Sequence, residues 1–421
     1  MITRRQLVAA LARRDVSDWV VIERAQELAT LDDARSLRRN DTRTRWTIIV
    51  HHDVPHGRGS ARLDLSTLDD SANDVVTQAL SIAEAAIGPA WQSTSPAAPA
   101  KVALLDPLLD KTNLEAVASE LVATVHRPEG ATVATLLELV RERVVVQARS
   151  GFHTAWTASS VRAESLITVG ERSLEITRDA RRIADLELDA ALAAAAADLA
   201  VLPAAAPPTP GRTAVILGPE ALLASAGGGV GMWRVFADYA NADVARTGLT
   251  RYHLGAPIAA GADQLAEPLT ITSDGALDWG TSSAPVGDEG DAVRRFPLIE
   301  RGIAVGLGMS MHEAARRRTD PNGGVRNLVV APGTWTDALP AGRTIEVRRL
   351  RSLAIDPHTG AATLDLALSI DRATNQAFAG GTLRIDLVTA LARARRSATT
   401  FRRGAYVGPT SVLIEGAELL A

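Results

Sequence analysis

The stretch GTSSAPVGDEGDAVRRFPLIERGIAVG, from Gly280 to Gly306, concentrates charge around a single glycine. Three carboxylates and two arginines lie within eight positions of one another, namely Asp288, Glu289, Asp291, Arg294 and Arg295. On the residues alone this is a turn with local ion pairs, each of which contributes little to stability when exposed. Gly290 in its centre permits a backbone conformation that a side chain would oppose. The segments on either side decide which fold this turn belongs to.

The second half of the chain is rich in short extended segments. TAVILG, PLTITSD, RNLVVAP, TIEVRRL, ATLDLALSID and GTLRIDL are separated by glycine, proline and aspartate turns. In ATLDLALSID, Leu364, Leu366 and Leu368 alternate with polar or small residues, as in a strand with one buried face. We therefore expect a β-rich C-terminal domain.

A proline-rich joint separates this half from the first. VLPAAAPPTPGR, Val201 to Arg212, holds four prolines in eight positions, which excludes a helix and favours an extended connector. The boundaries expected from it are an N-terminal domain over 1–202, a linker over 203–211 and a C-terminal domain over 212–421. A second proline-rich break, STSPAAPAK from Ser93 to Lys101, predicts a long loop.

The first half mixes helical and extended patterns. SANDVVTQALSIAEAAIG predicts a helix with Ser71 as its N-cap and Asp74 at the capping-box position. KTNLEAVASELVATVH and RDARRIADLELDAALAAAAADLAV show the same period, whereas RWTIIVHH, SARLDLS, RVVVQARS and SLITVGERSLEITRD read as strands. We predict an α+β protein whose N-terminal α/β domain places helices on a mixed sheet beside the β-rich second domain.

Composition excludes several classes of function. The chain has a formal net charge of -4 and a pI near 6.1, which disfavours generic nucleic-acid binding. It has no cysteine, which excludes thiolate metal ligands and cysteine nucleophiles. The N-terminal MITRRQLVAALARRDV predicts a short amphipathic helix, not a signal peptide, and no apolar run suffices for a membrane span. We expect a cytoplasmic protein, and its scarcity of lysine is typical of a GC-rich bacterial genome.

MHEAARRR, Met311 to Arg318, differs by one residue from the H-E-x-x-H signature of zinc proteases. The position of the second histidine is Arg316, whose guanidinium stays protonated and cannot donate a lone pair to zinc. The simpler, structural interpretation is that His312 and Glu313 belong to a helix with an arginine-rich, solvated face.

Two other motifs invite functional hypotheses. HHDVPHGRG contains His51, His52, Asp53 and His56, which form either part of a metal site or a solvated hairpin tip. SAGGGVGMW lacks the lysine of a phosphate-binding loop and the spacing of a dinucleotide fingerprint, so flexible backbone explains it better. No G-x-S-x-G nucleophile elbow occurs.

The order of these segments resembles the TldD/PmbA family, whose members carry a D-x-E-G turn, then basic residues and an LIE-x-G segment. Here the last is Leu298 to Gly302. GRGSARLDLSTLDDSANDVVTQAL, AIDPHTGAATLDLALSID, AFAGGTLRIDLVTAL and GPTSVLIEG match further segments of the family in the same order.

The resemblance implies a two-domain protein that pairs with a homologue. In the family, the TldD-type subunit of a heterodimeric peptidase carries zinc on an H-E-x-x-x-H helix with a further cysteine, and the TldE (PmbA) type carries no metal. The corresponding segment here, MWRVFADYANADVARTG (232–248), has neither histidine nor glutamate. The chain is therefore expected to have no catalytic residues, no metal and no cofactor of its own, with zinc in a TldD-like partner.

On this view the chain completes a chamber for a peptide substrate. We expect it to bind neither nucleic acid nor a membrane. Contact with substrate or partner is assigned to Asp288, Glu289, Gly290 and Arg294. Two alternatives stay open: a subunit or enzyme dedicated to a small peptide conjugate in specialised biosynthesis, and a homo-oligomeric peptide-binding protein. The stretch before the acidic turn lacks an aromatic residue common in the family, which would reshape the chamber.

Overall fold

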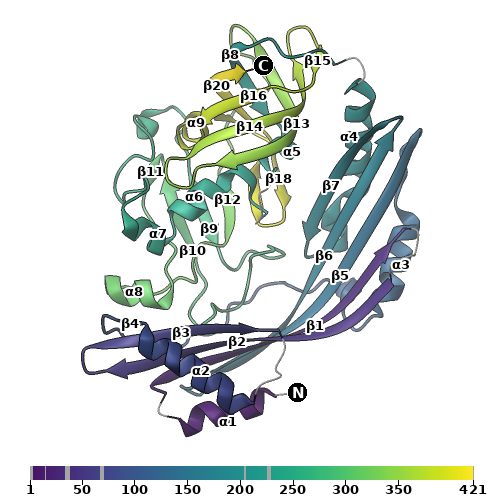
Figure 1. The fold of residues 1–421 in the computed structure, drawn as a ribbon. Coiled ribbons are helices and arrows are strands. Elements are labelled where there is room, and N and C mark those ends of the chain that lie inside the picture. Colours follow the sequence, from purple (N-terminus) through teal and green to yellow (C-terminus); the bar gives the residue numbers. More distant parts are fainter. Residues whose placement is uncertain are drawn as a thin grey trace.

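The structure is a computed structural model that describes residues 3–14, 16–33, 38–66, 71–202, 205–224 and 229–420. The chain folds into an N-terminal sheet with helices and a C-terminal unit stacked over the concave face of that sheet (Figure 1). Pro203 and Ala204 of the expected linker, and Ser225 to Gly228 of the glycine-rich run, lie outside the described residues. No helix in the described ranges is long and apolar enough to cross a membrane.

Seven strands form the N-terminal sheet in the order β4-β3-β2-β1-β5-β6-β7. They are β1 (Asp18–Asp32), β2 (Arg38–Val54), β3 (Gly57–Leu65), β4 (Ile87–Gly88), β5 (Ala131–Ala148), β6 (His153–Val169) and β7 (Arg172–Ala180). In the described part of this domain they are accompanied by the α-helices α1 (Arg4–Arg13), α2 (Ala72–Ala85), α3 (Leu114–Thr124) and α4 (Leu188–Val201). Helix α2 begins as expected, since the Ser71 side chain accepts a hydrogen bond from the Asp74 backbone N–H.

The two faces of this sheet have different partners because side chains alternate along each strand. On β1, Trp19 and Val21 belong to the core under α1 and α2. Val20 and Ile22 point the other way and pack with Val286 of the C-terminal domain. One face is therefore covered by helices, and the opposite face meets the second domain.

The α+β class is confirmed, but the expectation of a mixed N-terminal sheet is wrong. Every neighbouring pair in this sheet is antiparallel. Short turns join β2 to β3, β5 to β6 and β6 to β7, and parallel neighbours would require longer crossovers. The helix expected over 178–201 begins later, at Leu188, because Arg178 and Ala180 pair with β6 instead.

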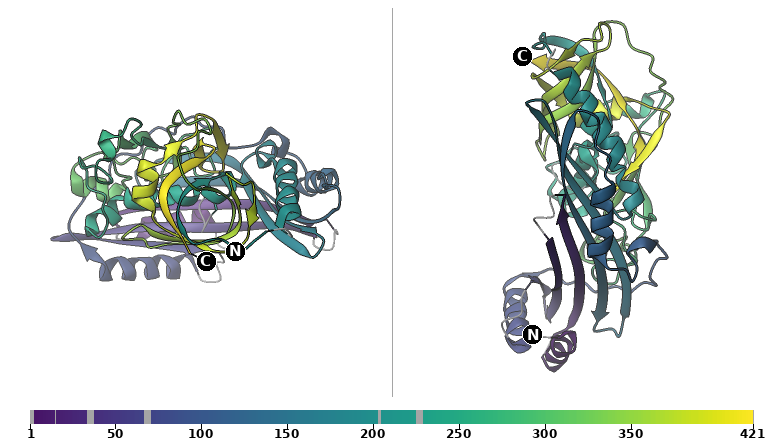
Figure 2. Two further views of the ribbon diagram at one scale, coloured as in Figure 1. Left: turned by 90° about the horizontal axis from the view of Figure 1, so that it is seen from above. Right: turned by 90° about the vertical axis from the view of Figure 1, so that its right-hand side faces the viewer.

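The C-terminal domain contains two sheets, and both include a parallel pair. The first has the order β11 (Ile303–Ala304), β10 (Arg295–Glu300), β9 (Ile271–Asp274), β12 (Asn327–Val330), β19 (Tyr406–Pro409) and β18 (Thr400–Arg403). The second has the order β13 (Thr344–Ile355), β8 (Gly211–Leu217), β20 (Val412–Leu420), β16 (Thr382–Asp386), β14 (Ala361–Asp371) and β15 (Ala377–Phe378), with β17 (Arg395–Arg396) paired to β20. Pairing of β13 with β14 closes the second sheet on itself, as the view from above shows (Figure 2).

Among the described residues of this domain, five short α-helices occur: α5 (Pro219–Leu222), α6 (Arg234–Tyr239), α7 (Ala242–Thr247), α8 (Met311–Arg317) and α9 (Leu387–Arg393). A single apolar cluster joins both sheets with α5, α6, α7 and α9, and Trp233, Phe236 and Tyr406 are among its fully buried members. This shared core holds the long loops between β9 and β10, and between α8 and β12, against the N-terminal sheet.

Candidate binding site between the two domains

The acidic turn identified in the sequence is a tight loop at the domain boundary. The Gly287 N–H donates to the Asp291 carbonyl at 2.9 Å, and the Gly290 N–H donates to the Gly287 carbonyl at 3.1 Å. Gly290 has φ of +80°, and a Cβ there would come within 3.0 Å of the Phe152 ring in the N-terminal domain. Glycine is required at this position both by conformation and by the close approach.

Two carboxylates of the turn contact side chains of the N-terminal sheet. Asp288 lies 2.7 Å from an Arg62 nitrogen and 3.7 Å from an Arg24 nitrogen. Glu289 lies 3.0 Å from Nε2 of the buried His51, whose Nδ1 is 2.9 Å from the Ser60 hydroxyl. His51 therefore joins the two domains, whereas His52 points to the opposite face of β2 and His56 is exposed in the hairpin turn.

The proline-rich loop at Ser93 to Lys101 also contacts this turn. The Ala97 N–H donates to the Gly290 carbonyl at 2.9 Å, and the Ala100 N–H donates to the Pro285 carbonyl at 2.8 Å. The long loop expected from the sequence is thus held by main-chain hydrogen bonds to the C-terminal domain.

Asp291 is the third carboxyl group of the turn and is 5% exposed. Burial raises its pKa to about 6, and the charge of Glu289 acts in the same direction. Backbone N–H groups and the nearby Arg326 oppose this shift without cancelling it. No salt bridge to Asp291 forms within the described residues.

The four residues assigned to substrate or partner contact thus separate. Asp288, Glu289 and Gly290 contact the N-terminal domain of the same chain. Arg294 points elsewhere and forms an exposed pair with Asp320 at 3.1 Å. Their role toward a substrate or a partner stays a prediction.

Behind the turn, a cavity of about 510 Å³ lies between the domains. Strands β1, β5 and β6 form one wall, and the loops at 281–288 and 323–326 form the other. Its apolar lining includes Ile22, Val146, Trp156 and Val286, and its charged lining comprises Arg24, Glu142, Arg181, Asp288 and Arg326. A second cavity of about 280 Å³ shares Glu142, Ser160 and Arg181 with the first and extends along the sheet.

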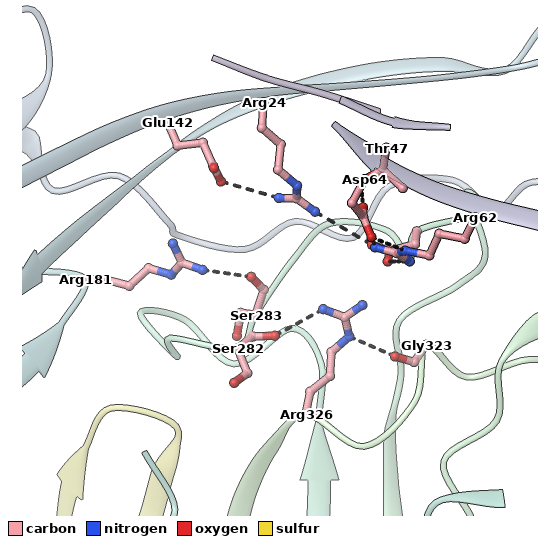
Figure 3. A network of polar contacts seen from close by, with 11 residues as sticks. Arg24, Thr47, Arg62, Asp64, Glu142, Arg181, Ser282, Ser283, Gly323 and Arg326 are labelled. Carbon is pink, nitrogen blue, oxygen red and sulfur yellow. Dashed lines mark hydrogen bonds and ion pairs between the residues drawn. The ribbon is translucent and has the colours of Figure 1, made fainter. Parts of the chain in front are cut away.

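Three guanidinium groups surround the first cavity (Figure 3). Arg24 lies 3.4 Å from Glu142 and 3.7 Å from Asp288. Arg181 donates only to carbonyl oxygens, those of Ser159, Gly280, Thr281 and Ser283. Arg326 donates to the carbonyls of Gly323 and Ser282 at 2.9 and 3.2 Å.

The zinc-protease lookalike forms α8, and its charged residues satisfy one another. Glu313 is 1% exposed and lies 2.9 Å from Arg246, with Arg316 and Arg317 at 3.9 and 3.7 Å. The His312 ring packs against Trp91 of the N-terminal domain at a tilt of 43°, with ring centroids 5.3 Å apart. Glu313 is therefore a structural carboxylate surrounded by arginines.

The segment in which the resemblance implies a zinc helix forms α6 and α7. Its two carboxylates, Asp238 and Asp243, pair with Arg234 and Arg246 at 3.2 and 3.3 Å. Across the described ranges, no group of three or more His, Cys, Asp or Glu side chains could hold a metal ion. The side chains of this segment do not fit a zinc site.

The three arginines of the cavity were not predicted from the sequence. Arg24, Arg181 and Arg326 lie far apart in the chain, and the fold brings them together. One signal was present: Arg24 and Glu142 interrupt the apolar strand segments VVIERA and RERVVV at positions that face the second domain.

Comparison with known proteins places this geometry in context. The family profile described as PmbA/TldA metallopeptidase C-terminal domain matches residues 210–418. No curated protein matches the chain by sequence. Among solved structures, TldE from Thermococcus kodakarensis is similar with a TM-score of 0.76 and 14% identity, over 99% of this chain and 100% of that one.

Two further solved structures share the fold over their whole length. A candidate modulator of DNA gyrase from Bacteroides thetaiotaomicron has a TM-score of 0.75 and 14% identity, with 100% of both chains covered. One from Thermotoga maritima has a TM-score of 0.75 and 14% identity, with 99% of both chains covered. The likeness therefore extends over both domains and is not confined to the matched C-terminal one.

Proposed function

Since the chain belongs to the TldD/PmbA family, we propose that it is the metal-free subunit of a two-chain zinc peptidase of the TldD/TldE type. The observation that carries the proposal is the segment 232–248, which has no histidine, glutamate or cysteine where the family's zinc helix is expected. The similarity of the whole chain to a TldE structure supports the same assignment.

In this role the chain contributes surface and no reacting group. A zinc ion in the partner would polarise the scissile carbonyl and activate a water molecule, and neither step needs a residue of this chain. The concave sheet with its two connected cavities supplies polar and apolar surface against which an extended peptide can lie. Substrate retention is therefore the function assigned to this subunit.

The test is co-expression of the chain with the TldD-like protein encoded nearest to it. Size-exclusion chromatography shows whether a complex forms, and cleavage of an unstructured peptide is measured for each chain alone and for both together. We expect a complex, and cleavage only when both chains are present.

Two results would contradict the proposal. Cleavage by this chain alone would make it an enzyme in its own right, as in a dedicated biosynthetic role. A stable symmetric assembly of this chain that does not bind the TldD-like protein would favour a homo-oligomeric peptide-binding protein.

A further inference from the structure

Two guanidinium groups in the interdomain cavity lack a carboxylate partner. Arg181 and Arg326 form no salt bridge with any described residue, and all their recorded hydrogen bonds go to backbone carbonyls. Protein walls surround both side chains, and solvent reaches them only in part. Buried charges in proteins are ordinarily paired, so this arrangement calls for an explanation.

The cost of this burial is visible in the acid–base properties of both groups. Burial lowers the pKa of Arg181 to about 10. It also lowers the pKa of Arg326, although Asp288 and Asp291 attract that guanidinium from beyond ion-pair distance. Both groups stay protonated at neutral pH. Each therefore carries a positive charge at the cavity, and no described carboxylate lies within ion-pair distance of it.

Arg326 has unused donors directed at this space. A guanidinium carries five N–H groups. The two recorded bonds of Arg326 leave three of them, including both on Nη2, without a protein acceptor. Arg326 lines the cavity, and its Nη2 donates to no described acceptor, so these N–H groups are available to a bound molecule. Arg181, in contrast, uses its donors to hold the loop at 280–283.

The charge balance of the lining indicates how much negative charge the cavity accepts. Three arginines and two carboxylates, Glu142 and Asp288, line it, which leaves one positive charge in excess. Both carboxylates already pair with Arg24, and Asp288 also pairs with Arg62. The imbalance fits a ligand with one negative charge better than a dianion such as a phosphate monoester.

The rest of the lining indicates the remainder of the ligand. Ile22, Val146, Trp156 and Val286 give the cavity an apolar wall. Its volume of about 510 Å³ lies in the range of small-ligand pockets. A small apolar group attached to one monoanion therefore matches both walls.

We propose that this cavity binds the carboxylate of a short peptide, with Arg326 as its main anchor and Arg24 beside it. The planar guanidinium fork matches a carboxylate with two parallel hydrogen bonds. The inference rests on the proposed function, which makes peptides the molecules that this chain encounters.

Isothermal titration of the isolated chain tests the inference without any variant. The probes are N-acetyl-tetra-alanine with a free C-terminal carboxylate and the same peptide with a C-terminal amide. The free acid should bind at least about tenfold more tightly, as expected for a charge-assisted hydrogen bond at a partly buried site. An amidated probe with one glutamate tells whether a side-chain carboxylate is accepted as well. Equal binding of acid and amide, or no binding of the acid at millimolar concentration, overturns the proposal.

Inorganic phosphate is the competing anion in the same titration. It should bind more weakly than the free-acid peptide, because the cavity has a single positive charge in excess. Tighter binding of phosphate would overturn the carboxylate assignment.

Variants locate the anchor. Arg326→Met should weaken binding of the free acid by about tenfold or more, and Arg326→Lys should restore part of it. Arg395→Gln is the matched control, because this arginine is exposed, pairs with Glu415 and does not line the cavity. Circular dichroism and thermal unfolding verify that each variant folds. Equal affinity of Arg326→Met and Arg395→Gln would contradict the anchor.

The two proposals can fail separately. The titration uses this chain alone and does not require a zinc subunit. If the two chains form a complex that cleaves peptides, but the isolated chain shows no preference for the free acid, only the carboxylate site is overturned. Carboxylate binding without a complex or cleavage would overturn only the subunit role.

Discussion

Glu220 and Asp291 are two shielded carboxyl groups at the same domain boundary, and their pKa values move in opposite directions. Burial would raise the pKa of Glu220, but Arg178, Arg403 and Arg349 outweigh it and hold the value below its ordinary one. Burial raises the pKa of Asp291, and no guanidinium lies close enough to reverse the shift. The same interface therefore contains one fully paired region and one that is charge-unbalanced.

The paired region ties the domains together. Glu220 lies 2.7 Å from Arg178 of β7 and 2.9 Å from Arg403, and Arg349 bridges Glu220 and Asp198 of α4. Near the acidic turn, Arg181 and Arg326 line a cavity and form no ion pair with a described carboxylate. Charge at this interface therefore ties the domains together at Glu220, whereas near Asp291 it leaves guanidinium groups that line a cavity.

Removing the carboxylate of the paired region should have the largest effect on stability. Glu220→Gln leaves the buried guanidinium of Arg178 without its partner, at an expected cost of about 3 kcal/mol in the free energy of unfolding. Urea unfolding at pH 7 measures this loss. Glu415→Gln is the matched control, because Glu415 forms an exposed pair with Arg395 at 2.6 Å and should cost less than about 1 kcal/mol. Equal losses in the two variants would show that the ion pairs of Glu220 stabilise the fold no more than an exposed pair does.

Removing the carboxyl group of Asp291, which forms no ion pair with a described residue, should raise stability instead of lowering it. The unfolded-state pKa of Asp291 is near 3.8 and its folded-state pKa is about 6. The folded chain therefore binds more protons between these values, and Asp291 makes stability fall as pH rises from about 4 to 6. Asp291→Asn should remove this fall and stabilise the chain at pH 7.5 by about 2 kcal/mol.

Urea unfolding of the wild type and of Asp291→Asn across this pH range provides the measurement. The informative quantity is the difference between the two proteins at each pH, because other groups titrate in both. A difference that stays constant from pH 4 to pH 7.5 would show that Asp291 is not the group responsible.

The close approach at Gly290 should have a smaller effect. Gly290→Ala places a side chain at positive φ and within 3.0 Å of Phe152, for an expected loss of about 1.5 kcal/mol. Gly130→Ala is the control, since φ is +73° there and no atom lies within 4 Å of the added Cβ. Thermal unfolding should show a larger loss for Gly290→Ala, and equal losses would exclude the contribution of the Phe152 contact.

The exposed ion pair of the acidic turn should matter least. Asp288→Asn removes one partner of Arg62, which keeps its pair with Asp64, and the Arg62 and Asp288 side chains are both more than 40% exposed. The expected loss is less than about 1 kcal/mol and should shrink further in high salt. A loss comparable with that of Glu220→Gln would mean that the turn itself holds the domains together.

The sequence predicted the fold where local patterns coincide with structure. The helix begun by Ser71 and the alternating strand with Leu364, Leu366 and Leu368 follow directly from spacing. The antiparallel arrangement of the first sheet was missed because strand direction depends on connections that periodicity does not report. The late start of α4 was missed because β6 pairs with Arg178 and Ala180, which overrides local helix preference.

The candidate site was predictable only in part. The acidic turn stands out because its charges are contiguous in the sequence. Arg181 and Arg326 lie 145 positions apart and acquire significance only when the β7 end and the loop before β12 meet across the cavity. The sequence left His51 between a metal site and a solvated hairpin tip, and its contact with Glu289 could not be foreseen because the two residues lie 238 positions apart.

The central claim is that zinc belongs to the partner and not to this chain. Elemental analysis tests it most directly, on this chain and on its complex with the TldD-like protein, both purified from zinc-supplemented cultures. We expect no stoichiometric zinc in the isolated chain and about one zinc ion per complex, as for a single catalytic site. About one zinc ion bound to the isolated chain, and lost on mutation of its own histidines, would contradict it.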